Sequence, residues 1–314
     1  MIEMNKDETY PSCMNGSMDY DRLIQIIEQT AERYPDLEVG YIGATILDKA
    51  IPVLSLGNQR ASKSVVYLGG IGAGDSVISA VLLRFVWDYL DFLKSGRRMY
   101  SVNLPYLFER RRIVVIPMLN CDGCSIRFNG CGEHLLKERL LSMNNGEEAF
   151  GEWYSNARGV DLRCNFSVGF QNRRTVSLRD GTDSGGRHGY GGTAPESEPE
   201  TASMCNYIRM NRGTSLLLNL HMDDNWLTYP GQENSDGAVP RIRTVGRLLS
   251  RMSSTAAMKK AEAMGTVEDW FAEEFRQSAF SVGCRYPDLE NTQDDYIKIY
   301  AYLRELLFSA PLLV

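Results

Sequence analysis

The segment that decides the fold class is SVVYLGGIGAGDSVISAVLLRFVWDYLDFL, residues 64–93. Residues 64–68 are mostly β-branched or apolar and predict a buried strand, and a glycine-rich loop follows at 69–74. Apolar residues at helical spacing then predict a long helix over 75–93, and residues 113–118 predict the next strand. This order of strand, helix and strand is typical of a parallel sheet covered by helices. We therefore expect an α/β fold with a mixed, largely parallel twisted sheet flanked by helices, and a site at the carboxyl ends of its strands.

The remaining elements follow from the same patterns. The sequence predicts an amphipathic helix at 20–34, a β-hairpin over 38–56, a helix at 199–210, a buried strand at 214–220 and a closing helix at 294–308. Residues 179–198 are rich in Gly, Ser and Asp and predict a long surface loop. Because no linker divides the chain, we expect residues 1–18 to be a polar lead-in and residues 19–314 to form one domain.

Composition narrows the classes of function. The chain has 34 Lys and Arg against 40 Asp and Glu, so it lacks the basic excess that binds nucleic acid or anionic lipid. It shows no secretory signal pattern at its start and no apolar run of about 18 residues that would span a bilayer. Seven irregularly spaced cysteines fit reduced thiols better than a disulfide framework. We expect a cytoplasmic protein with no nucleic-acid or membrane partner, and the sequence leaves the oligomeric state open.

Six short segments occur in one order along almost the whole chain. They are Tyr34-Pro35 with Ile42-Gly43-Ala44-Thr45, Ile116 to Gly123, Asn156 to Leu162, Tyr190 with Gly192, Ser197 to Thr201, and Asp269-Trp270-Phe271. Together they resemble the zinc carboxypeptidase family, and within it the bacterial peptidases that cut γ-D-glutamyl-diaminopimelate bonds in cell-wall peptides. The resemblance implies the fold of that family, which is a phosphorylase/hydrolase-like α/β/α fold. A fold by itself does not imply an activity, so the site residues decide the function.

The resemblance also implies where the catalytic chemistry would lie. Members of the family hold zinc through the His and Glu of an HxxE motif and a second His, and a glutamate activates the water. In this sequence Gly72 stands at the first ligand position and Asp75 at the glutamate position, and only His221 keeps its identity. Gly283 stands where the general base is expected and has no group that accepts a proton. We expect a weak remnant of a metal site at Asp75 and His221, and no catalytic residue.

The positions that would hold the substrate carboxylate have changed as well. The family motif DLNRNF corresponds to residues 161–166, where Arg163 replaces an Asn and Cys164 replaces the Arg. Arg163 is a candidate for binding a ligand carboxylate, or it is a solvated side chain. Arg139 resembles the arginine that stabilises the oxyanion in related bacterial sequences, or it is an ordinary arginine on a helix surface. Cys164 is a further candidate ligand-binding residue, and with His221 it raises the hypothesis of a thiol nucleophile.

A separate metal site is conceivable in a cysteine-rich segment. Cys121, Cys124, Cys131 and His134 form the pattern C-x2-C-x6-C-x2-H, which has the donor types of a structural zinc site. The six-residue gap is short for such a site, so four independent side chains are the alternative. We expect no cofactor, with zinc as the one that remains open.

Two interpretations of the function follow. The first is a catalytically inactive pseudo-peptidase that binds a peptide or a cell-wall muropeptide in the remnant cleft. The alternative is a weak or atypical metallopeptidase, of carboxypeptidase or γ-D-glutamyl-diaminopimelate peptidase type. In that case Asp75, His221 and a rearranged partner hold zinc, and Glu273, Glu274 or another acid serves as the base. An enzyme built on the thiol of Cys164 is the third hypothesis.

Overall fold

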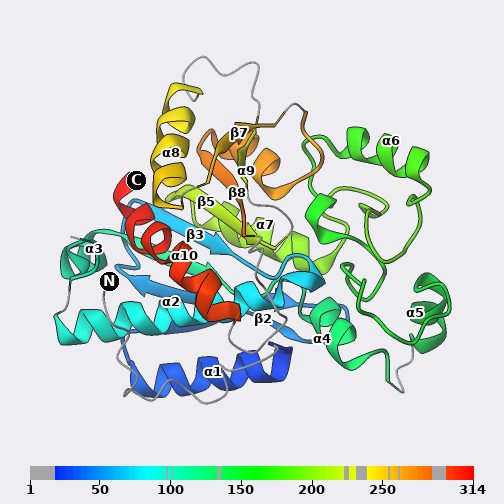
Figure 1. Ribbon diagram of the computed structural model, residues 1–314, viewed down its shortest axis with the longest axis horizontal. Helices are drawn as coiled ribbons and strands as arrows, with labels where there is room; N and C mark the ends of the chain where they lie inside the picture. The colour runs from blue at the N-terminus through cyan, green and yellow to red at the C-terminus, as the bar shows by residue number, and fades with distance from the viewer. Residues whose placement is uncertain are drawn as a thin grey trace.

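In the described part of the chain, eight strands form one sheet (Figure 1). This computed structural model describes residues 18–96, 98–100, 102–132, 136–222, 226–230, 239–253, 255–260, 262–284 and 295–314. The strands are β1 (Glu38–Ala44), β2 (Ala50–Gly57), β3 (Ser64–Leu68), β4 (Arg112–Ile116), β5 (Thr214–His221), β6 (Leu227–Tyr229), β7 (Ala257–Lys259) and β8 (Ser278–Gly283). Their order in the sheet is β1-β2-β4-β3-β5-β8-β6-β7. The central strands β4, β3, β5 and β8 are parallel, and antiparallel pairs attach β2 and β6 on either side.

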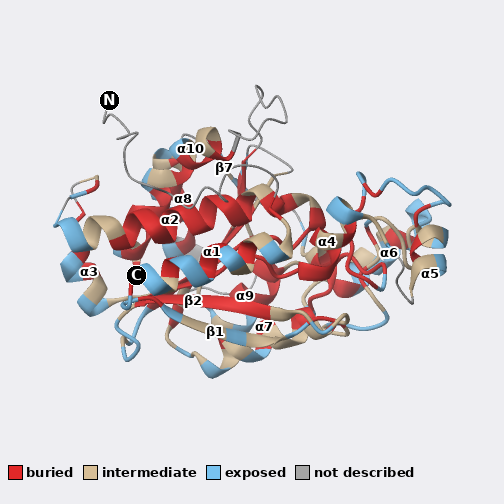
Figure 2. Cartoon of the chain, turned by 90° about the horizontal axis from the view of Figure 1, so that it is seen from below, coloured by how far each residue is buried: buried red, intermediate tan, exposed pale blue. Residues whose placement is uncertain are grey.

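Helices cover both faces of this sheet. They are α1 (Tyr20–Arg33), α2 (Ser76–Ser95), α3 (Leu104–Arg110), α4 (Cys121–Asn129), α5 (Lys137–Met143), α6 (Phe170–Asp180), α7 (Pro199–Met210), α8 (Val239–Met252), α9 (Val267–Phe275) and α10 (Asp295–Ser309). Helices α1, α2, α8 and α10 share one hydrophobic core, and α7 and α9 belong to a second core on the other face. Figure 2 shows α2 buried along most of its length. The observed layers confirm the expected mixed α/β architecture.

Alternation along β5 decides which face carries the polar groups at its end. Leu216, Leu218 and Leu220 pack in the core that contains α2, whereas Leu217 packs in the core that contains α9. Because successive side chains of a strand point to opposite faces, residues 219 and 221 share the face of Leu217. The polar end of β5 therefore lies on the α9 side of the sheet.

Helices α4, α5 and α6 lie beyond the carboxyl ends of the central strands (Figure 1). A small core of six buried residues holds part of this region together: Ala73, Ile126, Leu140, Phe150, Trp153 and Ala157. The predicted loop at 179–198 begins two residues inside α6, and the rest of it has no helix or strand. Within the described residues, no helix has the length and apolar character needed to cross a membrane.

Candidate functional site

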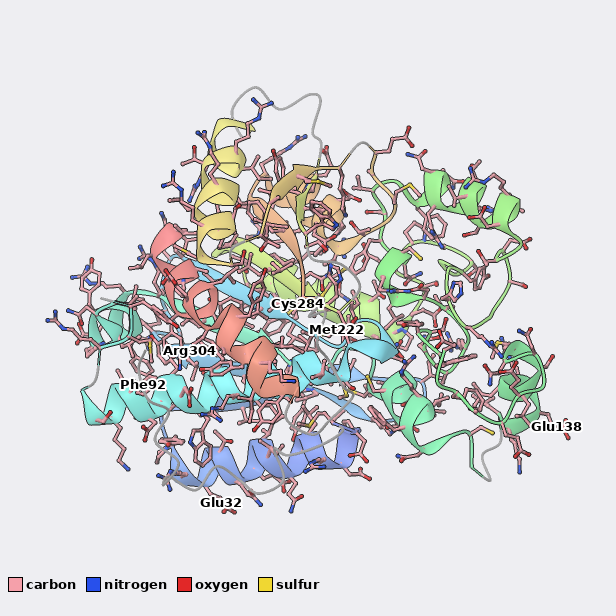
Figure 3. All side chains as sticks on the ribbon, viewed as in Figure 1. Glu32, Phe92, Glu138, Met222, Cys284 and Arg304 are labelled. Atoms are coloured by element: carbon pink, nitrogen blue, oxygen red, sulfur yellow. The ribbon has the colours of Figure 1, made fainter. Side chains whose placement is uncertain are left out.

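The carboxyl ends of β3, β5 and β8 bring together residues that are far apart in the sequence. His221, the last residue of β5, is paired in parallel register with Gly283, the last residue of β8. Asp75 follows β3, and its Oδ1 accepts a hydrogen bond from the backbone N–H of Met222 at 3.0 Å. Figure 3 shows Met222 and Cys284, the neighbours of His221 and Gly283, close together in the middle of the molecule. We call the group Gly72, Asp75, Arg163, His221, Ser281 and Gly283 the carboxyl-edge site.

The side chain of Asp75 accepts hydrogen bonds from two loops at this site. Its side chain is buried, and its Oδ2 accepts a hydrogen bond from the backbone N–H of Gly72 at 3.1 Å. The other oxygen accepts the bond from Met222. Both carboxylate oxygens thus accept hydrogen bonds from backbone amides, and a metal ion would have to compete with these bonds.

The side chain of Arg163 lies over Gly72. A Cβ atom on Gly72 would be 3.3 Å from Arg163 Cδ and 3.6 Å from its Nε. The guanidinium donates from Nε and Nη2 to the two oxygens of Asp161, at 2.9 Å each, and lies 4.8 Å from the centre of the Tyr154 ring. Burial would raise the pKa of Asp161, but the charge and hydrogen bonds of Arg163 lower it below the ordinary value. Because the Arg163 side chain is 27% exposed, the site contains a fixed cation that solvent can reach.

His221 has a hydroxyl neighbour. Its Nε2 lies 2.6 Å from Ser281 Oγ, and both side chains are partly exposed. Ser281 precedes Gly283 by two residues and therefore lies on the same face of β8. The sequence reasoning missed Ser281, although strand alternation from Gly283 would have indicated it.

A buried ion pair lies on the same face as His221. Asn219 Nδ2 donates to Glu268 Oε1 at 2.7 Å, and Lys260 Nζ donates to Glu268 Oε2 at 3.2 Å. Burial would raise the pKa of Glu268, but the charge of Lys260 and hydrogen bonds from Thr266 and Asn219 outweigh it and hold the pKa at about 2. Glu268 therefore stays a carboxylate near neutral pH and is a poor proton acceptor. No sequence signal links these residues, because Lys260 reaches Glu268 only through the fold.

The two glutamates considered as substitute bases have partners of their own. Glu274 Oε1 accepts from Arg209 Nε at 2.6 Å, and Glu273 Oε1 accepts from Arg276 Nη2 at 2.9 Å. Their side chains are 35% and 47% exposed, whereas Glu268 on the inner side of α9 is buried. Both glutamates thus lie on the solvent side of α9, away from its buried face.

Cys164 and Arg139 lie outside the carboxyl-edge site. Cys164 is buried, its Sγ donates to the carbonyl oxygen of Asp161 at 3.3 Å, and burial raises the pKa of the thiol. Arg139 is exposed on α5, whose residue Glu138 lies at the far margin of the molecule from Met222 in Figure 3. Of the three predicted ligand-binding residues, the structure brings only Arg163 to the site. The roles of the other two stay predictions.

The predicted cysteine cluster falls mainly on α4. Cys121 and Cys124 are fully buried, and burial raises the pKa of both thiols, which disfavours the thiolate form that zinc binds. Cys131 is partly exposed after the helix, and His134 lies outside the described residues. Among the residues that the structure describes, no three His, Cys, Asp or Glu side chains form a group that could hold a metal ion.

The described residues of the carboxyl-edge site do not fit the catalytic zinc site that the resemblance implies. A catalytic zinc ion needs three protein ligands, and only two of the three positions, Asp75 and His221, carry a side chain that can bind zinc. Both oxygens of Asp75 bind backbone amides, and the cationic Arg163 side chain lies over the position of the first ligand. What the arrangement offers chemically is a positioned guanidinium and polar side chains for holding a ligand.

A family model described as zinc carboxypeptidase matches residues 23–306 of the chain. The chain is 27% identical over 277 residues to the γ-D-glutamyl-L-diamino acid endopeptidase 1 of Lysinibacillus sphaericus, which covers 86% of this chain and 66% of that protein. It is 25% identical over 217 residues to the mast cell carboxypeptidase A of Rattus norvegicus, which covers 68% of this chain and 47% of that protein. The chain thus spans from about half to just under two thirds of the length of these two relatives.

Solved structures share the fold at low sequence identity. Bovine thrombin-activatable fibrinolysis inhibitor, in complex with tick carboxypeptidase inhibitor, matches with a TM-score of 0.71 and 18% identity over 96% of this chain and 97% of that chain. Carboxypeptidase A from Helicoverpa armigera matches with a TM-score of 0.71 and 15% identity over 98% of this chain and 77% of that chain. These likenesses confirm the expected architecture.

Proposed function

The chain belongs to the zinc carboxypeptidase family, and from this premise we propose that it is a member that binds a peptide at the carboxyl-edge site without hydrolysing it. The ligand in this proposal is a carboxylate-bearing peptide of the cell-wall muropeptide class. One observation carries the proposal: the side chain of Arg163 lies over Gly72, where the family has its first metal ligand.

The state of Arg163 supports a role in binding. A guanidinium binds carboxylates through charge-assisted hydrogen bonds, and a hydrogen bond to a charged group contributes about 1.5–3 kcal/mol. Asp161 and the ring of Tyr154 already hold the side chain in place. Less conformational entropy is then lost when a ligand binds.

The groups around His221 support the absence of hydrolysis. Gly283 brings no carboxylate to activate water, and the nearby Glu268 keeps its pKa at about 2, since Lys260 and hydrogen bonds outweigh the effect of burial. A general base works best when its pKa lies near the working pH. The name of the Lysinibacillus sphaericus relative, an endopeptidase for γ-D-glutamyl-L-diamino acid bonds, supports the choice of ligand class.

The test is calorimetric titration of the full chain with L-alanyl-γ-D-glutamyl-diaminopimelate. The wild type should bind saturably, and Arg163→Gln should bind about 10- to 100-fold more weakly because a charge-assisted pair is lost. Arg163→Lys should fall between them, since it keeps the charge but loses the fork geometry. Arg212→Gln is the matched control, because Arg212 is exposed and lies just before β5, at the opposite edge of the sheet.

Mass spectrometry of the same mixtures checks the second half of the proposal. The peptide should stay intact during a long incubation with added zinc. Cleavage that a chelator abolishes would instead favour the weak metallopeptidase, and equal affinities of wild type and Arg163→Gln would remove Arg163 from the site.

A further inference from the structure

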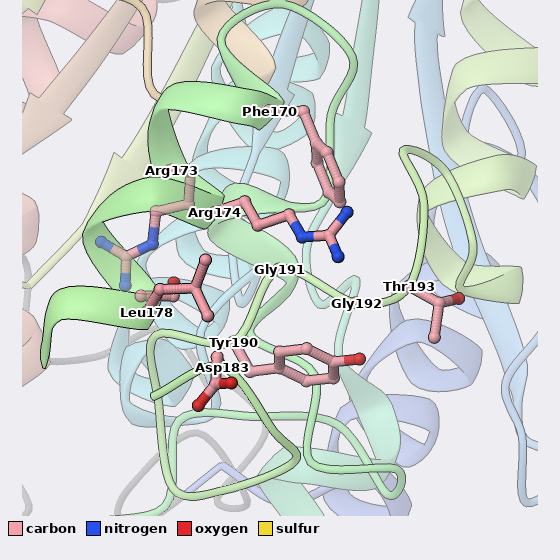
Figure 4. Close-up of a pocket in the computed structure, with 10 residues that line it drawn as sticks. Phe170, Arg173, Arg174, Leu178, Asp183, Tyr190, Gly191, Gly192 and Thr193 are labelled. Atoms are coloured by element: carbon pink, nitrogen blue, oxygen red, sulfur yellow. The ribbon is translucent and has the colours of Figure 1, made fainter. Parts of the chain in front are cut away.

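A second place for a ligand lies outside the carboxyl-edge site. A pocket of about 230 Å³ opens between α6 and the segment from Tyr190 to Thr193 (Figure 4). None of its lining residues belongs to the carboxyl-edge site. Ligand pockets usually measure about 300–1,000 Å³, so this one suits a single small molecule or one residue of a peptide.

Three charged side chains line the pocket, Arg173, Arg174 and Asp183, and the last two have opposite charges. Figure 4 shows Arg174 extending from α6 past Phe170 on one side, and Asp183 beside Tyr190 on the other. Neither Arg174 nor Asp183 forms an ion pair with the other or with any residue in the described part of the chain. Both charges are therefore available to a ligand.

The other charged side chains of α6 near the pocket have hydrogen-bond or ion-pair partners. Arg173 also lines the pocket, but its guanidinium donates twice to the carbonyl oxygen of Gly189, at 3.1 and 2.8 Å. Arg179 and Asp180, at the end of the same helix, pair with each other at 2.9 Å. Arg173 keeps its positive charge although hydrogen bonds hold its guanidinium, so Arg174 and Asp183 are the charged lining residues without an ion-pair or hydrogen-bond partner in the described part of the chain.

The rest of the lining is apolar or uncharged. Phe170 and Leu178 provide apolar surface, and Leu178 is 60% exposed although it is a large hydrophobic residue. Gly191 and Gly192 form part of the wall without side chains. An aliphatic group beside Phe170 and Leu178 would remove apolar surface from water.

We propose that this pocket binds a zwitterionic amino acid, or the amino-acid end of a branched peptide. The α-carboxylate binds Arg174, the α-ammonium binds Asp183, and the aliphatic side chain packs on Phe170 and Leu178. A simple cation would be repelled by Arg173 and Arg174, and a simple anion would leave Asp183 unpaired, whereas a zwitterion pairs with both Arg174 and Asp183. The pocket thus selects for the pair of charges.

The experiment measures binding of three related probes to the full chain by calorimetry or ligand-observed NMR. L-Leucine carries both charges, N-acetyl-L-leucine carries only the carboxylate, and L-leucinamide carries only the ammonium. The wild type should bind leucine saturably and at least tenfold more tightly than either derivative. Arg174→Gln and Asp183→Asn should each weaken leucine binding at least tenfold.

Arg179→Gln and Asp180→Asn are the matched controls. They make the same changes of charge a few residues away, at an exposed pair outside the pocket, and should bind leucine like the wild type. Three results would overturn the inference: no saturable binding by the wild type, equal affinity for the three probes, or equal losses in the pocket and control variants. The outcome is separate from the proposed function, which is tested with another ligand and other variants.

Discussion

Gly72 has no side chain, and the side chain of Arg163 lies in the space next to it. Any Cβ at residue 72 would lie 2.9 Å from Asp75 Oδ2 and 3.3 Å from Arg163 Cδ. A histidine there, as the family has, would need the Arg163 side chain to move. The residue at position 72 and the position of the Arg163 side chain are thus coupled by packing.

This coupling can be measured as a double-mutant cycle. Gly72→Ala should lower the free energy of unfolding by about 1–3 kcal/mol because it overpacks the loop. In an Arg163→Asn background the loss should be smaller by at least about 0.5 kcal/mol, since one of the clashing groups is gone. Gly151→Ala, with open space around its Cβ, is the control in denaturant unfolding. Equal losses in both backgrounds would show that the two residues are independent.

Single residues were predictable from the sequence where regular structure fixes their direction. His221 and Gly283 end neighbouring parallel strands, so their pairing follows from the fold. Arg163 was harder, because residues 162–164 form a 3-10 turn, in which strand alternation does not fix the direction of a side chain. The direction of its side chain depends on Asp161 and Tyr154, which only the folded chain brings to it.

At the scale of elements, the first turn of α7 carries a buried acid. Glu200 is fully buried, and its Oε2 accepts from Asn156 Nδ2 at 3.4 Å. Burial, Asp122 and Glu198 raise its pKa to about 7. The folded state therefore binds this proton more tightly than the unfolded chain, and the contribution of Glu200 to stability falls as pH rises from about 4.5 to about 7.

Glu200→Gln removes that titration. Relative to the wild type, the variant should gain stability between pH 5 and pH 8, by up to about 3 kcal/mol. The measurement is denaturant unfolding of both proteins across this range. Glu273→Gln makes the same substitution at an exposed glutamate and is the matched control. A pH-independent difference for Glu200→Gln would show that its carboxyl titrates normally.

Elements with strong periodicity were predictable, and those held by long-range contacts were not. The helix over 75–93 and the strand over 64–68 agree with α2 and β3 because their apolar patterns are strong. Helix α6 was missed because its sequence is mostly polar and only two of its residues are buried. Edge strands β6 and β7 have three residues each, which is too short for a periodic signal.

At the scale of the whole molecule, the fold is shared with carboxypeptidases, whereas the function depends on the residues of the site. The α/β/α architecture matches solved carboxypeptidases over nearly the whole chain. The order of the six motif segments along the sequence predicted this architecture, because those segments form loops and strand ends of the fold. Whether the site hydrolyses a ligand or only binds it depends on a few side chains at the carboxyl edge. A shared fold does not determine these side chains.

The most direct measurement is zinc content per chain after equilibrium dialysis of the full protein, purified without chelators or a His tag. Wild type, His221→Ala and Cys131→Ser are compared by elemental analysis. We expect His221→Ala to hold the same zinc as the wild type, because in the proposed function the carboxyl-edge site binds its ligand through Arg163 and not through a metal. About one zinc per chain that survives Cys131→Ser and is lost in His221→Ala would contradict this and establish a working metal site at the end of β5.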